Sequence, residues 1–403
     1  MVEEEGELSS KLKERFLGSN LSVLTSTSMI ATFGNGIWTF LMPLYLVFIG
    51  VPVILVGIVY MAIAASSSFS PVLGGSLADR FGRKPVILLS QLTHVPLLLI
   101  MAFFSHYPYA VIIALVSWRF AGTMATPARM TLIAESSGKR GKEHAYATWR
   151  SFTDAVTVSS PLIGGLLLYG GDFSFAFIVS AILNAISFAI RYRFLSETNH
   201  TLKSERRIFK TIRMGLKDLT ANTFVLTLTS ASVASLFLSG MSEYLVPIFS
   251  YEVLKMGSAY IGLLFSIQVA ITAIVLNPGA VLSKKIGRLN LILIGVATSS
   301  LFEVLYALSL GAIIALLFFG LWIAFDVITH PAISALKYDS VNKERASTDL
   351  GSISTLASLV SIAAPATGML LYISAPRLPF YTSASFMLLV YIILWTVGKQ
   401  NKQ

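Results

Sequence analysis

Four charged residues stand inside long apolar stretches of this sequence, and their types can carry a proton or hold a solute. Asp326, Glu243 and Asp154 are carboxylates, which take up and release protons, and Arg119 in the segment WRFAG is a lasting cation. At 1.5 Å per helical residue, Arg119 lies roughly 18 Å from either end of its stretch, too deep for its side chain to reach water. Charges in such places are costly, so each is a functional hypothesis.

The surroundings of the three carboxylates indicate different roles. Asp326 is near the middle of its stretch and is the first choice for a proton or substrate site, with Glu243 as the second. Asp154 follows Arg150 by four residues, so on a helix the two share a face and are expected to form a local ion pair. His330 precedes a proline and is expected to be structural.

The apolar stretches are long enough to cross a membrane. The 403 residues are 55% hydrophobic and 12% charged, with a mean hydropathy of +0.75, which one water-soluble core could not accommodate. Lipid leaves unpaired backbone groups unsatisfied and the stretches lack the alternation of barrel strands, so they must be helices. We predict an all-α integral membrane protein with twelve transmembrane helices, over residues 21–49, 53–78, 84–105, 107–134, 145–169, 173–194, 219–249, 256–283, 288–309, 311–338, 348–373 and 377–398.

The 30 Lys and Arg residues set the orientation. Most of them fall in alternate loops and at the ends of the chain, so both termini are predicted to be cytoplasmic, in a multi-pass protein of the cell membrane. This bias accounts for the net charge of +10 without a nucleic-acid partner. The absence of cysteine excludes disulfides and thiolate metal sites, and we expect no metal and no cofactor.

The sequence contains an internal repeat. GIWTFLMPLY at 36–45 is similar to GMSEYLVPIF at 240–249, and Gly82-Arg83, Pro127-Ala128 and Pro161 recur 204 or 205 positions later. We therefore predict two homologous six-helix bundles, 1–194 and 219–403, joined by a basic cytoplasmic linker, 195–218. Parallel repeats of this kind place a binding site between the halves and alternate its access by rocking one half against the other.

The loop between the second and third helices, GSLADRFGRK at 75–84, concentrates charge between two apolar helices. Gly75 and Gly82 permit a sharp turn, and Arg80 and Arg83 keep the loop on the cytoplasmic side. Asp79 serves neither purpose. We expect it to face the positive N-terminal end of the helix that begins near residue 348, in the opposite half.

This loop resembles the signature of the major facilitator superfamily, G-x-L-a-D-r-x-G-r-k, matched at eight positions within 75–84. Twelve helices, the repeat and the basic central linker are similar to that family as well. The resemblance implies a cytoplasmic latch in which Asp79 faces the eleventh helix and Arg83 faces Glu135. Through the repeat, Arg288 and Asp339 are expected to form the second pair, whereas a lysine replaces Asp79 in the second copy.

Within that family, SSPLIGG at 159–165 looks like the g-x-x-x-G-P-x-x-G-G motif of proton-coupled antiporters, through Ser160, Pro161, Gly164 and Gly165. Serine replaces a usual glycine at 160, and these small residues could equally be a helix-packing face.

The place of Arg119 is similar to that of a helix-4 arginine that the family links to proton coupling; the alternative is a buried structural pair. The resemblance also implies that Arg119 and Asp326 line one central cavity, whereas Glu303 lies on a peripheral scaffold helix. The remaining cavity lining is expected to be aromatic, from Trp38, Phe40, Tyr244 and Trp322.

The function predicted is secondary active transport by alternating access, as proton-coupled efflux of drug-like or amphiphilic small molecules by a monomer. A proton-coupled uptake symporter for a small metabolite is the alternative, and a membrane scaffold or receptor without transport is the alternative from another class. No H-E-x-x-H, G-x-S-x-G or cysteine nucleophile supports an enzyme, and no G-x-x-x-x-G-K-[ST] loop supports ATP-driven pumping.

Overall fold

The described part of the chain is built from helices alone. A computed structural model describes residues 19–137, 141–168, 173–198, 223–340 and 346–400. Ten of its helices are long and apolar enough to cross a membrane, and a bent pair raises the number to eleven. The remaining span of the twelve predicted falls on α8 (Lys142–Leu167), which has 26 residues but a polar first half, so twelve spans stay a prediction.

The chain forms two compact units. Unit 1 covers residues 1–39 and 69–204, and unit 2 covers 40–68 and 205–403, so α4 (Val53–Phe81) contributes to both. The other helices of unit 1 are α2 (Asn20–Thr39), α5 (Arg83–Phe103), α6 (Pro108–Met124), α7 (Thr126–Glu135), α8 and α9 (Phe173–Phe194). Those of unit 2 are α3 (Met42–Phe48), α11 (Thr223–Ser242), the 3₁₀ turn η3 (Glu243–Leu245), α12 (Val246–Glu252), α13 (Ser258–Ile286), α14 (Arg288–Leu308), α15 (Ala312–Val327), α16 (His330–Ser340), α17 (Ala346–Ser361), α18 (Ala364–Ser374) and α19 (Leu378–Gln400).

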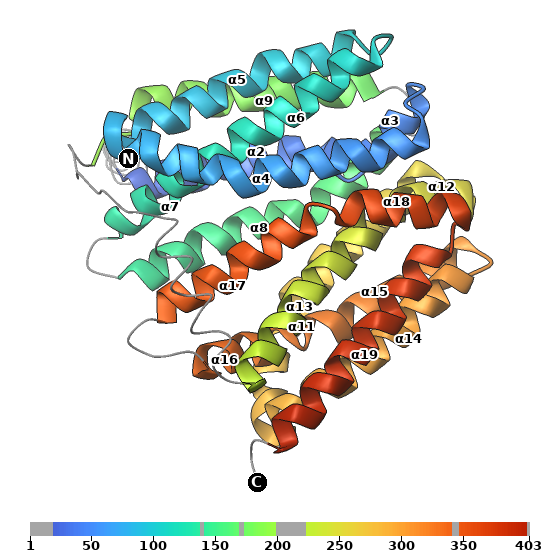
Figure 1. Ribbon diagram of the computed structural model, residues 1–403. Coiled ribbons are helices and arrows are strands. Elements are labelled where there is room, and N and C mark those ends of the chain that lie inside the picture. Colours follow the sequence, from blue (N-terminus) through green and yellow to red (C-terminus); the bar gives the residue numbers. More distant parts are fainter. Residues whose placement is uncertain (1–18, 138–140, 169–172, 199–222, 341–345, 401–403) are drawn as a thin grey trace, which may run out of the picture. The chain divides into compact units, whose positions relative to one another are not determined.

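Each unit is a bundle of long helices around its own apolar interior. In unit 1, α5 lies beside α6 and α9, and α2 packs against α8 and α9 (Figure 1). In unit 2, α14 lies between α15 and α19, and α11 packs against α19 (Figure 1). Buried residues such as Leu24 and Ile133 hold unit 1 together, and Leu228 and Tyr391 do the same in unit 2.

Prolines mark the points at which the spans break, and the breaks follow the repeat. The short helices α3 and α12 have seven residues each and begin 204 positions apart, with Pro43 and Pro247 in their first turns. Pro127 and Pro331 take the same place at the start of α7 and α16. Proline suits a first turn because its missing N–H would have no helical partner there.

The repeat also preserves one close helix contact. A Cβ on Gly164 of α8 would overlap the backbone of Ile37 on α2, and a Cβ on Gly368 of α18 would overlap the backbone of Met241 on α11. Gly164 and Gly368 are 204 positions apart in the sequence, and so are Ile37 and Met241. Glycine is therefore required at 164 and 368 so that the helix backbones can touch.

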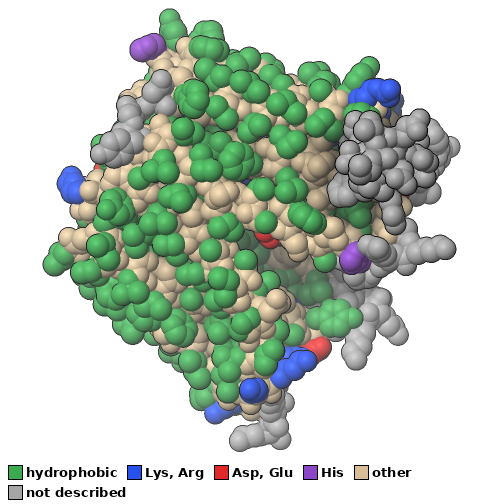
Figure 2. Space-filling view, turned by 180° about the vertical axis from the view of Figure 1, so that it is seen from behind, with side chains coloured by type: hydrophobic (Ala, Val, Ile, Leu, Met, Phe, Trp, Pro, Cys, Tyr) green, Lys and Arg blue, Asp and Glu red, His purple; other side chains and the backbone are tan. Residues whose placement is uncertain are grey.

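The outer surface is apolar. Hydrophobic side chains cover most of the face in Figure 2, and Lys and Arg appear at a few places near its edges. Ile113 in the second turn of α6 is 67% exposed, and Ile274 in the middle of α13 is 70% exposed. Such a surface is stable against lipid chains and unstable in water.

Candidate functional site

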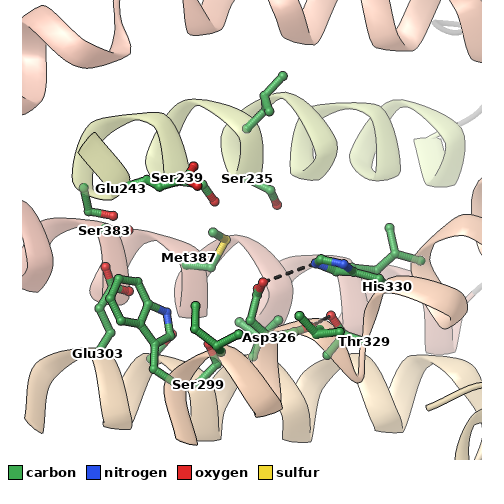
Figure 3. A pocket seen from close by; sticks show the side chains of 18 of the residues that line it. Ser235, Ser239, Glu243, Ser299, Glu303, Asp326, Thr329, His330, Ser383 and Met387 are labelled. Atoms are coloured by element: carbon green, nitrogen blue, oxygen red, sulfur yellow. Dashed lines mark hydrogen bonds and ion pairs between the residues drawn. The ribbon is translucent and has the colours of Figure 1, made fainter. Parts of the chain in front are cut away.

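A pocket of about 540 Å³ lies inside unit 2. Lys337 of α16 lines it, and four other ionisable side chains come from separate elements: Glu243 at the η3 break, Glu303 on α14, Asp326 on α15 and His330 at the start of α16. Figure 3 shows these side chains turned toward the same space, with Ser383 and Met387 of α19 beside them. Three carboxylates and one imidazole thus share a cavity within the membrane-spanning part of the unit.

Asp326 and His330 form an ion pair across the break between α15 and α16. His330 Nε2 is 3.2 Å from an Asp326 carboxylate oxygen, and the two side chains keep 50% and 41% of their surface accessible (Figure 3). The helix ends at Val327, and the Thr329 hydroxyl donates to the Asp326 carbonyl, so the break places both side chains on one side. Both side chains line the pocket.

The contact of His330 was not anticipated from the sequence. His330 was expected to be structural, but it pairs with Asp326 and lines the pocket. The spacing of four residues between them is the same signal that predicts the pair of Arg150 and Asp154.

Glu303, expected on a peripheral scaffold helix, has its side chain inside the bundle. Its side chain is 4% exposed, lines the pocket, and leaves Oε1 without a hydrogen-bond partner among the described residues. Figure 3 shows it near Ser383, at the same end of the pocket as Glu243. A buried carboxyl with an unused oxygen can bind a proton or a solute donor.

The rest of the pocket wall combines serines with aromatic residues. Nine serines line it, among them Ser235, Ser239 and Ser299 (Figure 3). Trp322 lines it, together with Phe265, on which Phe40 stacks with ring centroids 4.7 Å apart. The serines offer hydroxyl donors and acceptors to a polar solute.

Two other predicted lining residues lie elsewhere. Tyr244 is outside this wall; its hydroxyl donates to the carbonyl of Pro365. Trp38 is fully buried within unit 1, where its indole donates to Ser180 at 3.1 Å and its ring meets Trp118 at a centroid distance of 4.8 Å. Its surroundings are those of a packed core residue.

Unit 1 has a pocket of its own, of about 320 Å³, and Arg119 lines it. Its wall also holds Arg129, Arg191 and His94. Arg191, in the last turn of α9, is 3% exposed, and its side chain is hydrogen-bonded inside the bundle. Arg119 and Asp326 line pockets in different units, so their facing one cavity stays a prediction.

Both ion pairs expected at the helix ends are present. Arg83 Nη2 is 2.8 Å from Glu135, and Arg288 pairs with Asp339. Gly82 and Gly287, with φ of +94° and +85°, form the turn before each arginine, a backbone shape that favours glycine. The two copies thus have the same local design.

The loop of unit 1 has an additional partner that the sequence did not reveal. Glu197, just after α9, accepts the backbone N–H of Lys84 at 2.8 Å. A carboxylate suits the positive N-terminal end of α5. Asp79 lies exposed in the last turn of α4, and its expected partner helix belongs to unit 2, so the latch across the units stays a prediction.

The residues of helix α8 have mainly local partners. Arg150 Nε donates to Asp154 at 2.6 Å, which confirms the local ion pair. Ser160 is fully buried, and a Cβ on Gly36 would overlap its side chain. Pro161 and Gly165 are buried beside them. This arrangement supports the helix-packing interpretation of SSPLIGG.

Among the described residues, no group of three or more His, Asp or Glu side chains is arranged to hold a metal ion.

Comparison with known proteins agrees with this architecture. Residues 24–365 match the sequence model of the Major Facilitator Superfamily. The class G tetracycline resistance protein of Vibrio anguillarum is 28% identical over 320 residues, covering 74% of this chain and 75% of that protein. An uncharacterized MFS-type transporter of Mycobacterium tuberculosis is 33% identical over 108 residues, 27% of this chain and 25% of its own length.

Solved structures show the same fold at low identity. The POT family transporter PepTSo superimposes with a TM-score of 0.75 at 13% identity, covering 95% of this chain and 99% of that one. The nucleoside transporter NupG gives 0.70 at 15% identity, covering 94% and 99%. The sequence match over most of the chain, the loop motif with its ion pairs and the shared fold establish that this protein is a transporter of the Major Facilitator Superfamily.

Proposed function

We propose that this transporter exports drug-like or amphiphilic small molecules in exchange for protons, by alternating access. The observation that carries the proposal is the pair of Asp326 and His330 in the acidic pocket of unit 2. The relative from Vibrio anguillarum, a tetracycline resistance protein, supports export over uptake. The superfamily match supports transport over a receptor, a scaffold or an enzyme.

The chemistry of the pocket suits exchange. A carboxylate that pairs with an imidazolium can instead take a proton, or bind a donor of the solute. If solute and proton compete for Asp326, capture of one at each face requires release of the other, and transport is coupled. Glu243 and Glu303 line the same wall and would supply further acceptors for a solute with donor groups.

The test is flux into proteoliposomes with an imposed pH gradient. The probe panel contains tetracycline, lipophilic cations, sugars and amino acids. An antiporter accumulates its solute in the acidic compartment whichever way the protein is inserted, so an acidic lumen should drive uptake into the vesicle. Accumulation driven by an acidic exterior would contradict efflux by exchange and identify a symporter.

The second candidate is a proton-coupled uptake symporter for a small polar metabolite. It is favoured by the nine serines of the pocket wall, which offer hydrogen bonds that an apolar solute would leave unused. The direction of the pH gradient that drives accumulation separates the two candidates in one experiment.

A further inference from the structure

We propose that the pocket of unit 1 binds an anionic oxygen group, such as a carboxylate, of the transported solute. The proposal rests on the proposed transport function in one respect: the anionic group belongs to a molecule that the protein transports.

The ionisable residues that line this pocket are all basic. Its lining includes Arg119, Arg129 and Arg191 from three different helical segments, together with His94 of α5. No Asp or Glu is among the residues that line it. The pocket of unit 2 differs, because its wall holds three carboxylates beside Lys337 and His330.

Arg191 is held by neutral groups. Its Nε donates to Thr27 Oγ1 at 2.9 Å, Nη1 to Gln91 Oε1 at 2.7 Å and Nη2 to Ser28 Oγ at 3.2 Å. Gln91 in turn donates to Asn184 Oδ1 at 2.6 Å. These bonds fix the guanidinium and satisfy its donors, but none of these partners carries a negative charge to offset it.

Arg129 and His94 have hydrogen-bonding capacity left over. Arg129 makes only long contacts from Nη2, 3.5 Å to the Gly122 carbonyl and 3.4 Å to the Thr126 hydroxyl, and its buried Nε has no partner among the described residues. His94 is 7% exposed, and neither of its ring nitrogens has a partner there. Buried polar atoms of this kind are rare unless a ligand or water meets them.

A bound anion accounts for both the uncompensated positive charge of the pocket and its unused N–H groups. A buried cation without an opposite charge is costly inside a membrane, and an arriving oxyanion removes that cost while accepting the unused N–H groups. Guanidinium forks match carboxylate oxygens in a bidentate geometry. The volume of about 320 Å³ suits an organic group and exceeds what a single inorganic ion fills.

The experiment measures equilibrium binding by isothermal titration calorimetry, with the purified full chain in detergent and no pH gradient. The probes are 1-naphthoate, its neutral match 1-naphthamide, and chloride. The variants are Arg119→Gln and Arg129→Gln, with Arg193→Gln as control, because Arg193 is exposed two residues after Arg191 on the same helix and stacks on Phe194. Circular dichroism and gel filtration identify any variant that fails to fold.

Naphthoate should bind the wild-type chain and Arg193→Gln equally. Either pocket variant that folds should weaken naphthoate binding by about tenfold or more, as expected when a hydrogen bond to a charged group is lost. Naphthamide should bind weakly to all of them.

Equal binding of naphthoate and naphthamide, or unchanged naphthoate affinity in every folded pocket variant, would overturn the proposal. Chloride binding as tight as that of naphthoate would overturn its organic part and leave an inorganic anion site. None of these results depends on the direction or coupling of transport, so a failure here is distinct from a failure of the efflux proposal.

Discussion

Replacing Arg83 and Glu135 by glutamine, singly and together, should give a coupling free energy of about 1–3 kcal/mol to the folded state. The magnitude follows from burial: the Arg83 side chain is 10% exposed and that of Glu135 30% exposed, with 2.8 Å between nitrogen and oxygen. Loss of one partner leaves the charge of the other partner unpaired and poorly hydrated. The double variant removes both charges and should recover part of the loss.

The repeat supplies the matched control. Arg288 and Asp339 occupy the corresponding places in unit 2, but their side chains are 41% and 52% exposed. An ion pair that open to water contributes about 0–1 kcal/mol, so the same cycle there should give a coupling near zero.

The assay is reversible unfolding of each chain in mixed detergent and SDS micelles, followed by circular dichroism. The measured quantity is the free energy of unfolding of the wild type, the two single variants and the double variant of each pair. Raising the salt from about 0.05 M to 0.5 M should reduce any coupling of the exposed pair and spare most of that of the buried pair. Equal coupling energies in the two cycles, or a larger one for the exposed pair, would refute the argument from burial.

Two further outcomes test the packing within unit 1. Gly164→Ala should lower the free energy of unfolding by about 1–3 kcal/mol, because the added methyl overlaps the backbone of Ile37. The control Gly351→Ala has open space around the added methyl and should not lower it. Equal effects of the two substitutions in thermal unfolding would contradict the close contact. Trp38→Phe keeps an aromatic ring but loses the bond to Ser180, and should cost about 1 kcal/mol. Because Ser180 also donates to Asn35 Oδ1, Ser180→Ala has a cost of its own, and the double variant should cost less than the sum of the two single variants. Additive costs in that double variant would argue against the bond.

Patterns that depend on neighbours in the sequence were predictable. The pair of Arg150 and Asp154 follows from their spacing on one helix turn. The pair of Arg83 and Glu135 was implied by the loop motif, and the repeat gave its second copy at Arg288. Apolar length alone indicated the helices.

Properties that depend on rotation of a helix about its axis were not predictable. Glu303 is in a peripheral position by family analogy, yet its side chain is turned into the bundle and lines the pocket. Arg191 ends an apolar helix, where a cytoplasmic place is the usual one, but its neutral partners come from α2 and α5, distant in sequence. Long-range partners of this kind leave no local periodicity to read.

The most direct test of proton-coupled exchange compares Asp326→Asn with wild type and with Glu252→Gln, in proteoliposomes with an acidic lumen. Glu252 is a suitable control because it is a carboxylate of the same unit that is outside the pocket wall and bonds to the Tyr372 hydroxyl at 2.7 Å. Wild type and Glu252→Gln should accumulate the solute, whereas Asp326→Asn should lose accumulation and retain downhill exchange of labelled for unlabelled solute. Full gradient-driven accumulation by Asp326→Asn would contradict the role of this carboxylate in coupling.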